Sequence, residues 1–451
     1  MNHSDILNGF FNKYTIMLKR GDKKLINAWA FYDWANSVYS LVIGTAIFPI
    51  YYASLTASEN FADIDGKISF LGTLWTPITL YDYALAFSFL VVAFMSPMLS
   101  GIADYAGNKK KFLKGFCLLG SLSVMCLFFF TDSSTLWVGI FFTILASIGF
   151  WGSIVFYNAY LPEIAYPEQQ DNASAKGFML GYFGSILLLV LCLVMIETQV
   201  FGFFDKQFGT QLSFVLVGIW WLGFAQITYA KLPNDEKVTL PKDNYFKKGL
   251  KEIRKVSKEL FQHQELKVFL ISFFLFSIGV QTIILMAGIF GSILGLETLN
   301  LIATILIVQF VGILGAFLFS RLSSKIGNIK TLKITIAIWG LVCFIGFNLS
   351  KDTPNIETYF YVLGGLIGLV MGAIQSLARS TYSKLLPKTD DTTSYFSFFD
   401  VTEKIALVVG MITFGLLNSI FSIQSSVLAL ALFFLASFIV LSFIKKTKYV
   451  Q

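Results

Sequence analysis

Charged and amide side chains occur at helical spacing inside stretches that are otherwise apolar. Asp33 is followed by Asn36 on one helical face, and Gln375 precedes Arg379 by four residues. Placing an ionisable group in a bilayer costs about 2.5–3.5 kcal/mol on insertion scales, so such residues need a role. A carboxylate can bind an amine or a proton, and a guanidinium can pair bidentately with a carboxylate. The spacing therefore predicts that these residues bind a solute or form a gate.

Each of these residues also has a structural interpretation. Asp33 could cap its helix and pair with a lysine. If Asp33 is instead functional, we expect the Asp33→Asn protein to keep its thermal stability and to lose transport activity. Gln281 could bond a neighbouring helix instead of a solute. Six residues are our candidates for contact with a solute or a coupling ion. They are Tyr32, Asp33, Asn36, Asn158, Gln281 and Gln375.

The elements that must position these residues are long apolar segments. The chain is 56% hydrophobic and only 14% charged, and a helix that crosses a bilayer needs roughly 20 apolar residues. Twelve such segments are predicted near 28–54, 83–103, 112–130, 136–158, 177–196, 212–230, 268–290, 299–320, 331–349, 358–380, 401–418 and 425–444. The fold class is therefore an all-α integral membrane protein.

The basic residues are distributed unevenly between the two sides of these segments. When the segments are threaded through a membrane, only Lys67, Lys206 and Lys351 of the 34 Lys and Arg residues fall on one side. The positive-inside rule then places both termini in the cytoplasm. Because the lysines flank the spans, the net charge of +7 indicates contact with lipid headgroups and not with nucleic acid.

A basic stretch divides the chain into 1–230, a cytoplasmic linker at 231–267, and 268–451. Apolar residues in the linker recur at helical spacing, with Asp243 or Asn244 as a possible cap. This pattern fits an amphipathic helix on the membrane surface, and it is compatible with a solvated linker that joins two bundles. The apolar positions are Phe246, Leu250, Ile253, Val256 and Leu260.

The two large segments carry short matching motifs in the same order. Gly107-Asn108 follows the second span and Gly327-Asn328 the eighth, while Leu161-Pro162 and Leu386-Pro387 follow the fourth and tenth. Six plus six spans with weak internal repeats predict the major facilitator fold, two six-helix bundles with a solute site between them.

The loop after the second span, residues 101–111, resembles the signature that major facilitator transporters carry there. Asp104, Gly107, Lys109 and Lys110 are its gating candidates, since an aspartate can accept hydrogen bonds from a helix N-terminus. In the second copy Ser324 stands where an acid would fit, so we expect a latch on one side only.

Three further motifs narrow the resemblance. They are Phe31–Ser37 in the first span, Asn158–Ile164 at the end of the fourth and Gly372–Ser380 in the tenth. Together they resemble the autophagy-type vacuolar effluxer family and its bacterial relatives, apart from Ala378, where we expect Ser. The fungal members are associated with amino-acid efflux from the vacuole, and the resemblance to the bacterial ones implies transport in a cytoplasmic (inner) membrane.

We therefore expect secondary active transport of a small polar solute, with amino acids as a candidate class, coupled to a proton or another ion. The sequence contains no GxxxxGK[ST] loop, and its four cysteines and two histidines lack metal-ligand spacing, so we expect no cofactor, no metal and no enzymatic activity. We also expect a monomer. The alternatives are a sensor without flux and an integral-membrane transferase.

The predicted span ends suggest a charged gate. Asp33, Glu163 and Arg379 lie at the cytoplasmic ends of spans one, four and ten, so Arg379 is expected to pair with Asp33 or Glu163 when the protein is closed on that side.

Two further patterns predict structural roles. We expect Asp400, Glu403 and Lys404 to cap span eleven at the membrane edge. Glycine stripes at Gly177/Gly181 and at Gly364/Gly368/Gly372 predict close helix packing.

Overall fold

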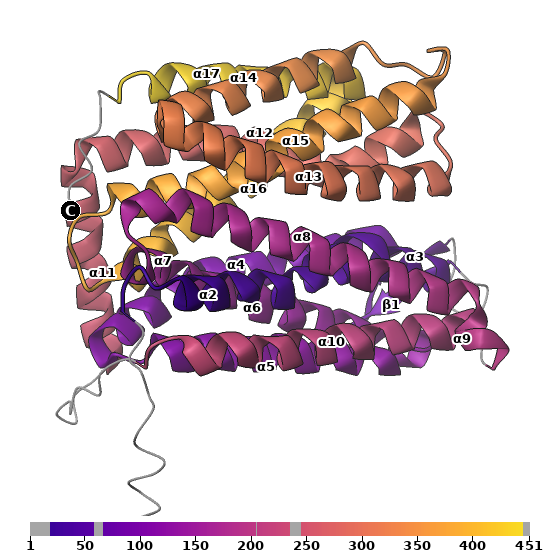
Figure 1. Ribbon diagram of the computed structural model, residues 1–451. Coiled ribbons are helices and arrows are strands. Elements are labelled where there is room, and N and C mark those ends of the chain that lie inside the picture. Colours follow the sequence, from indigo (N-terminus) through magenta and orange to yellow (C-terminus); the bar gives the residue numbers. More distant parts are fainter. Residues whose placement is uncertain (1–18, 58–65, 204, 235–244, 445–451) are drawn as a thin grey trace, which may run out of the picture.

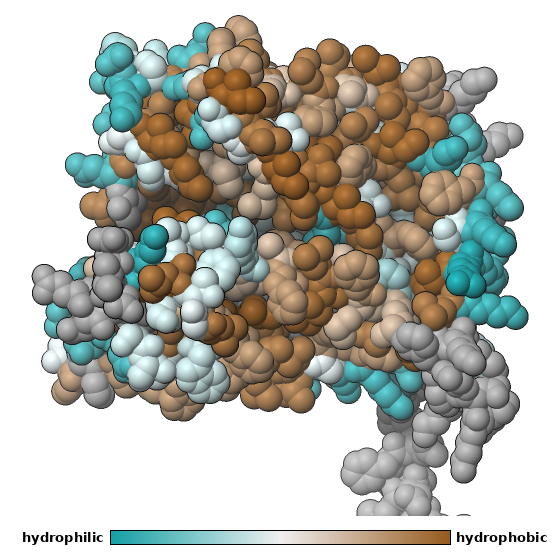
Figure 2. Space-filling model, turned by 180° about the vertical axis from the view of Figure 1, so that it is seen from behind, coloured by the Kyte–Doolittle hydropathy of each residue, from teal (hydrophilic) through white to brown (hydrophobic). Residues whose placement is uncertain are grey.

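The computed structural model describes residues 19–57, 66–203, 205–234 and 245–444. This part of the chain contains twelve helices that are long and apolar enough to cross a membrane. Figure 2 shows a hydrophobic surface across the middle of one face, with hydrophilic side chains gathered at two opposite ends. The protein is thus an all-α membrane protein, as the hydropathy predicts.

The N-terminal half holds six of the spans. Its elements are α2 (Lys23–Val38), η1 (Tyr39–Ala46), α3 (Phe48–Thr56), β1 (Ile68–Phe70), β2 (Thr73–Trp75), α4 (Pro77–Ala106), α5 (Lys109–Cys126), η3 (Leu127–Phe129), η4 (Ser133–Thr135), α6 (Leu136–Ala159), α7 (Leu161–Ile164), α8 (Pro167–Glu197), α9 (Gln199–Gly202) and α10 (Lys206–Lys231). The two short strands pair as an antiparallel hairpin.

The C-terminal half holds the other six, after the connecting helix α11 (Tyr245–Gln262). They are α12 (Gln264–Ile293), α13 (Thr298–Ile326), α14 (Asn328–Phe347), α15 (Ile356–Leu385), α16 (Thr392–Ile420) and α17 (Ile423–Leu441). Figure 1 shows the halves side by side, with α11 lying across one end of the bundle and the β1–β2 hairpin at the other. We call these the α11 end and the hairpin end.

Helix α11 packs against the protein itself. It contacts α4 of the N-terminal half and α12 and α16 of the C-terminal half. Val256 and Leu260 are buried, whereas Leu250 is exposed. The linker thus ties the two halves together at the α11 end. The expected cap at Asp243 or Asn244 lies outside the described residues.

The first span is not a regular α-helix throughout. Between α2 and α3 the backbone follows a π-helix, in which the Ile47 amide donates to the Val42 carbonyl five residues earlier. Pro49 near the start of α3 has no N–H, so it cannot continue the regular ladder. Hydropathy, which averages over a window, does not register such a break.

Close helix packing fixes the position of α15. A Cβ atom on Gly368 would lie 2.4 Å from the Val308 carbonyl oxygen, and one on Gly372 would lie 2.3 Å from that of Gly312. Only glycine permits α15 to approach α13 so closely. Across the halves, α8 packs on α13 and α15, while α16 packs on α4 and α6.

Candidate functional site: charged contacts between the two halves

Arg379 projects from α15 into a cup formed by the N-terminal half. Its Nη1 and Nη2 atoms donate to Asp33 Oδ2 at 3.2 and 3.1 Å. The side chains are only 5% and 10% exposed. Asp33 lies on α2, so this buried ion pair joins the two halves.

The other donors of the guanidinium are also satisfied by the N-terminal half. Nη1 donates to Asn158 Oδ1 at 3.2 Å, Nε to Ser174 Oγ at 2.9 Å, and Nη2 to the Ser174 carbonyl at 2.9 Å. Asn158 lies on α6 and Ser174 on α8. We refer to Asp33, Asn158, Ser174 and Arg379 as the Arg379 site.

Aromatic rings surround the Arg379 site. The guanidinium carbon lies 4.4 Å from the Phe178 ring centroid and 4.9 Å from that of Trp29. Tyr157 donates its hydroxyl to Asp33 Oδ2 at 2.9 Å. These rings exclude water and add cation–π attraction, which strengthens the pair while the cup is closed.

Other residues that are candidates for solute contact lie beside the Arg379 site. Tyr32 is fully buried, with its ring 5.0 Å from that of Tyr157. Asn36 follows Asp33 by about one turn and is buried, and its Nδ2 has no hydrogen-bond partner among the described residues. Gln375 accepts from Tyr182 across the halves at 3.0 Å.

Gln281 does not belong to this group. Its Nε2 donates to Glu403 at 2.6 Å, within the C-terminal half.

The charged residues of α16 do not cap the edge of a span as expected. Helix α16 begins at Thr392, so Asp400, Glu403 and Lys404 lie two to three turns inside it. Asp400 and Lys404 are buried. Hydropathy placed the start of this span late because hydroxyl-rich residues precede it.

The loop signature forms a second contact between the halves. The Asp104 carboxylate accepts the backbone N–H groups of Thr393 and Ser394 at 3.2 and 2.6 Å, in the first turn of α16. A negative charge there complements the helix dipole. Gly107 ends α4 in the left-handed region, with φ of 56°.

Glu163 is not a partner of Arg379. Its carboxylate pairs with Lys109 and accepts the Thr392 hydroxyl at 2.6 Å, so it binds the start of α16 instead. Lys110 donates to the Leu232 carbonyl at 2.7 Å, which fixes the loop to the end of α10.

A third contact was missed by sequence reasoning, and it corrects the expectation of a one-sided latch. Asp171 on α8 pairs with Lys384 on α15 at 2.7 Å, with both side chains at most 7% exposed. Its carboxylate also accepts from Asn328 at 2.7 Å and Ser323 at 2.8 Å. We call these four residues the Asp171 cluster.

The Asp171 cluster mirrors the Arg379 site. Here an acid of the N-terminal half enters a cup formed by α13, α14 and α15 of the C-terminal half. The second loop has Ser324 where the first loop has an acid, and the acid of this contact is Asp171 on α8 of the other half. The sequence signals were Asn328 in the second Gly-Asn motif and Lys384 five residues after Arg379.

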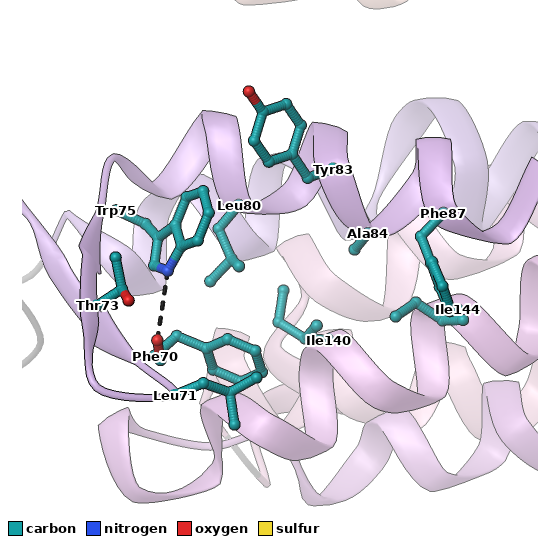
Figure 3. A pocket seen from close by; sticks show the side chains of 10 residues that line it. All are labelled: Phe70, Leu71, Thr73, Trp75, Leu80, Tyr83, Ala84, Phe87, Ile140 and Ile144. Atoms are coloured by element: carbon teal, nitrogen blue, oxygen red, sulfur yellow. Dashed lines mark hydrogen bonds between the residues drawn. The ribbon is translucent and has the colours of Figure 1, made fainter. Parts of the chain in front are cut away.

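A pocket of about 210 Å³ lies elsewhere, between the hairpin and the ends of α4 and α6. Figure 3 shows its lining, which includes Phe70, Leu80 and Ile140, with the Trp75 indole donating to the Phe70 carbonyl. The lining contains no charged residue. It offers little to hold a polar solute, and we assign none to it.

Comparisons with known proteins fit this architecture. The family model "Vacuole effluxer Atg22 like" matches residues 21–450. The "Uncharacterized MFS-type transporter YxiO" of Bacillus subtilis is 30% identical, over 95% of this chain and 96% of its own length. "Autophagy-related protein 22" of Coccidioides immitis is 22% identical, over 85% of this chain and 80% of its own length.

Solved structures share the fold at low sequence identity. The transporter FucP in the outward conformation aligns with a TM-score of 0.65 at 14% identity, over 94% of this chain and 98% of its own. The proton:xylose symporter XylE aligns with a TM-score of 0.64 at 14% identity, over 95% and 96%. The chain therefore has the major facilitator fold and belongs to the Atg22-like vacuole effluxer family of membrane transporters.

Proposed function

We propose that this protein is a secondary active transporter that moves a small polar solute by alternating access. The observation that supports this most is the insertion of Arg379 from one half into a buried cup of the other. For access to alternate, the two halves must separate at one end, and the Arg379 site is then the contact that opens.

The energetics suit a reversible gate. Burying an ion pair yields little net stability, because desolvation offsets most of the attraction. Removing one partner, in contrast, leaves a buried charge and costs about 3–5 kcal/mol. A closed Arg379 site is thus specific, yet it can open when water enters and solvates both charges.

The α11 end is proposed to face the cytoplasm. Lys67 stands beside the hairpin, Lys206 begins α10 and Lys351 precedes α15, all at the hairpin end. The basic α11 lies at the opposite end, which the positive-inside rule assigns to the cytoplasm. Because the halves are joined at this end, we propose that the protein is closed toward the cytoplasm in this conformation.

The solute is proposed to be a small zwitterion, with amino acids as the first class to test. Asp33 and Arg379 supply the charges that complement an ammonium and a carboxylate. One turn away, the buried Asn36 Nδ2 has no hydrogen-bond partner among the described residues. A solute that competes for either charge would weaken the interdomain pair and so link binding to opening.

Transport is tested with purified protein in liposomes. A thermal-shift screen of amino acids, dipeptides and nucleosides selects a ligand, and time-dependent uptake of that labelled ligand is then measured. We expect Arg379→Gln to abolish uptake and Arg321→Gln to retain it, because Arg321 is an exposed arginine on α13. Ligand binding without flux in the wild type would contradict the proposal.

A further inference from the structure

A separate group of charged side chains lies inside the C-terminal half. Lys404 Nζ is 3.0 Å from Asp400 Oδ1 and 3.7 Å from Glu403 Oε2. All three lie on α16, about 12–18 Å along the helix from Thr392, at 1.5 Å per residue. The cluster thus lies two to three turns inside a helix that is long and apolar enough to cross a membrane. We call Asp400, Glu403 and Lys404 the Lys404 cluster.

The neighbouring helices add no further ionisable group to the Lys404 cluster among the contacts of the described residues. Helix α12 contributes Gln281, which donates to Glu403, and α6 contributes Trp151, whose ring centroid lies 3.4 Å from Lys404 Nζ. Helix α17 contains no charged residue. The charged groups that α4 and α11 bring to α16 are Asp104, Lys255 and Glu259, and they contact its start at 391–395 instead.

The Lys404 cluster has an excess of negative charge. Two carboxylates face a single ammonium, so full ionisation leaves one uncompensated negative charge. Asp400 is 3% exposed, and its Oδ2 atom is buried with no hydrogen-bond partner among the described residues. An unpaired buried charge of this kind is costly in a membrane interior.

One proton would remove this excess, since a protonated carboxyl group is neutral and gains an O–H donor. A metal ion fits less well: no group of three or more His, Cys, Asp or Glu side chains in the described residues is placed to hold one. The Glu403 side chain is 21% exposed, so the cluster is not fully enclosed by the protein.

We propose that the Lys404 cluster binds one exchangeable proton, shared by Asp400 and Glu403, and that this is the ion-coupling site of the transporter. A carboxylate oxygen takes the proton from water on one side of the membrane and returns it to water on the other. No other bond forms or breaks. The coupling role rests on the proposed transport function, whereas proton binding does not.

The contact with Trp151 links proton binding to conformation. Trp151 belongs to the N-terminal half, so it leaves Lys404 when the halves separate at the α11 end. Losing the ring changes the surroundings of the ammonium that both carboxylates share. Proton occupancy and opening would then influence each other reciprocally.

The test uses the purified full-length protein in detergent, with the proton as the probe. Thermal unfolding is recorded from mildly acidic to mildly alkaline pH for the wild type, Asp400→Asn and Glu403→Gln. The control is Glu357→Gln, an exposed acid at the start of α15. A neutral residue in the cluster removes the excess charge at every pH.

We expect the Asp400→Asn curve to meet the wild-type curve at acidic pH and to lie above it at alkaline pH, where the wild type loses its proton. Glu357→Gln should follow the wild type throughout. A constant offset of both cluster variants at all pH values would overturn the proposal, because it would indicate a purely structural role.

Two further measurements begin with the wild type, and the first of them needs no folded variant. Infrared spectroscopy of the wild type should show the carbonyl band of a buried protonated carboxyl group, and this band should disappear as the pH rises. Absence of the band at every pH would overturn the proposal.

The second measurement tests for a metal cation. Replacing choline chloride with sodium chloride should not change wild-type unfolding at alkaline pH. Stabilisation by sodium that both cluster variants lose would identify a metal-cation site and contradict proton binding. None of these measurements depends on flux, so failed transport would count against the proposed function alone.

Discussion

Gly177 leaves the space that the Asp33 carboxylate occupies: a Cβ atom at position 177 would lie 2.3 Å from Asp33 Oδ2. The same atom would lie 2.9 Å from Arg379 Nη2. Helix α8 therefore allows the interdomain ion pair to form only because this residue has no side chain. The glycine stripe of α8 is a steric requirement of the Arg379 site as well as a packing feature.

Gly177→Ala is accordingly expected to push Asp33 and Arg379 apart. Overpacking of this kind costs typically about 1–3 kcal/mol, and we expect a lower unfolding temperature together with a loss of uptake. Gly223→Ala is the matched control, because a Cβ atom at that helical glycine meets nothing within 4 Å. Equal behaviour of the two variants would contradict the steric argument.

The Asp171 cluster should behave as a buried pair. Asp171→Asn or Lys384→Met alone leaves a buried charge and should destabilise the protein by about 3–5 kcal/mol, whereas the double variant should recover part of that loss. The exposed pair Glu197–Lys206 is the control, and Glu197→Gln should cost no more than about 1 kcal/mol. Thermal unfolding of the four variants measures this coupling, and additive losses at Asp171 and Lys384 would show that the pair is not coupled.

Much of this arrangement follows from the sequence, and the rest depends on tertiary packing. Asp33 and Arg379 could be predicted because ionisable residues inside apolar spans are conspicuous. Asp171 was missed because α8 begins ten residues before the predicted span at 177–196, which placed this residue in a loop. Hydropathy detects the apolar middle of a helix but not its polar ends.

The partners within each cluster were harder to predict than its members. Glu163 and Asp33 were both candidates for Arg379, and only packing decides that Glu163 turns to Thr392 instead. The Lys404 cluster was placed at a helix end, although it lies deep in α16. Which face a charge occupies depends on how two halves dock, and no local pattern in the sequence encodes that.

Asp104 is expected to hold the α11 end closed by binding the start of α16. Asp104→Ala should cost about 0.5–2 kcal/mol, the usual range for a lost helix cap, and should favour separation of the halves. A cysteine at Ser376, which is buried at the interface in the closed state, should then react faster with a maleimide.

Asp205→Ala is the control for this effect, since Asp205 caps α10 at the hairpin end by accepting the Phe208 N–H at 2.7 Å. It should lower stability by a similar amount and leave the reactivity of the cysteine at Ser376 unchanged. If both variants increase that reactivity, Asp104 acts through general stability and not through the gate.

The orientation is tested by cysteine labelling in intact cells. A membrane-impermeant maleimide should label a cysteine at Gly72 in the hairpin without permeabilisation, and one at Lys258 on α11 only after it. Both positions are exposed. The reverse pattern would place the α11 end outside and exchange the two faces of the proposed cycle.

The proposed alternating access requires the halves to separate at the α11 end during transport. Glu163 and Thr392 contact each other across the halves there, at 2.6 Å between their side-chain oxygens. In Glu163→Cys/Thr392→Cys, a short cleavable cross-linker should abolish solute uptake, and reductive cleavage should restore it in the same sample. Full uptake by the cross-linked protein would contradict the account.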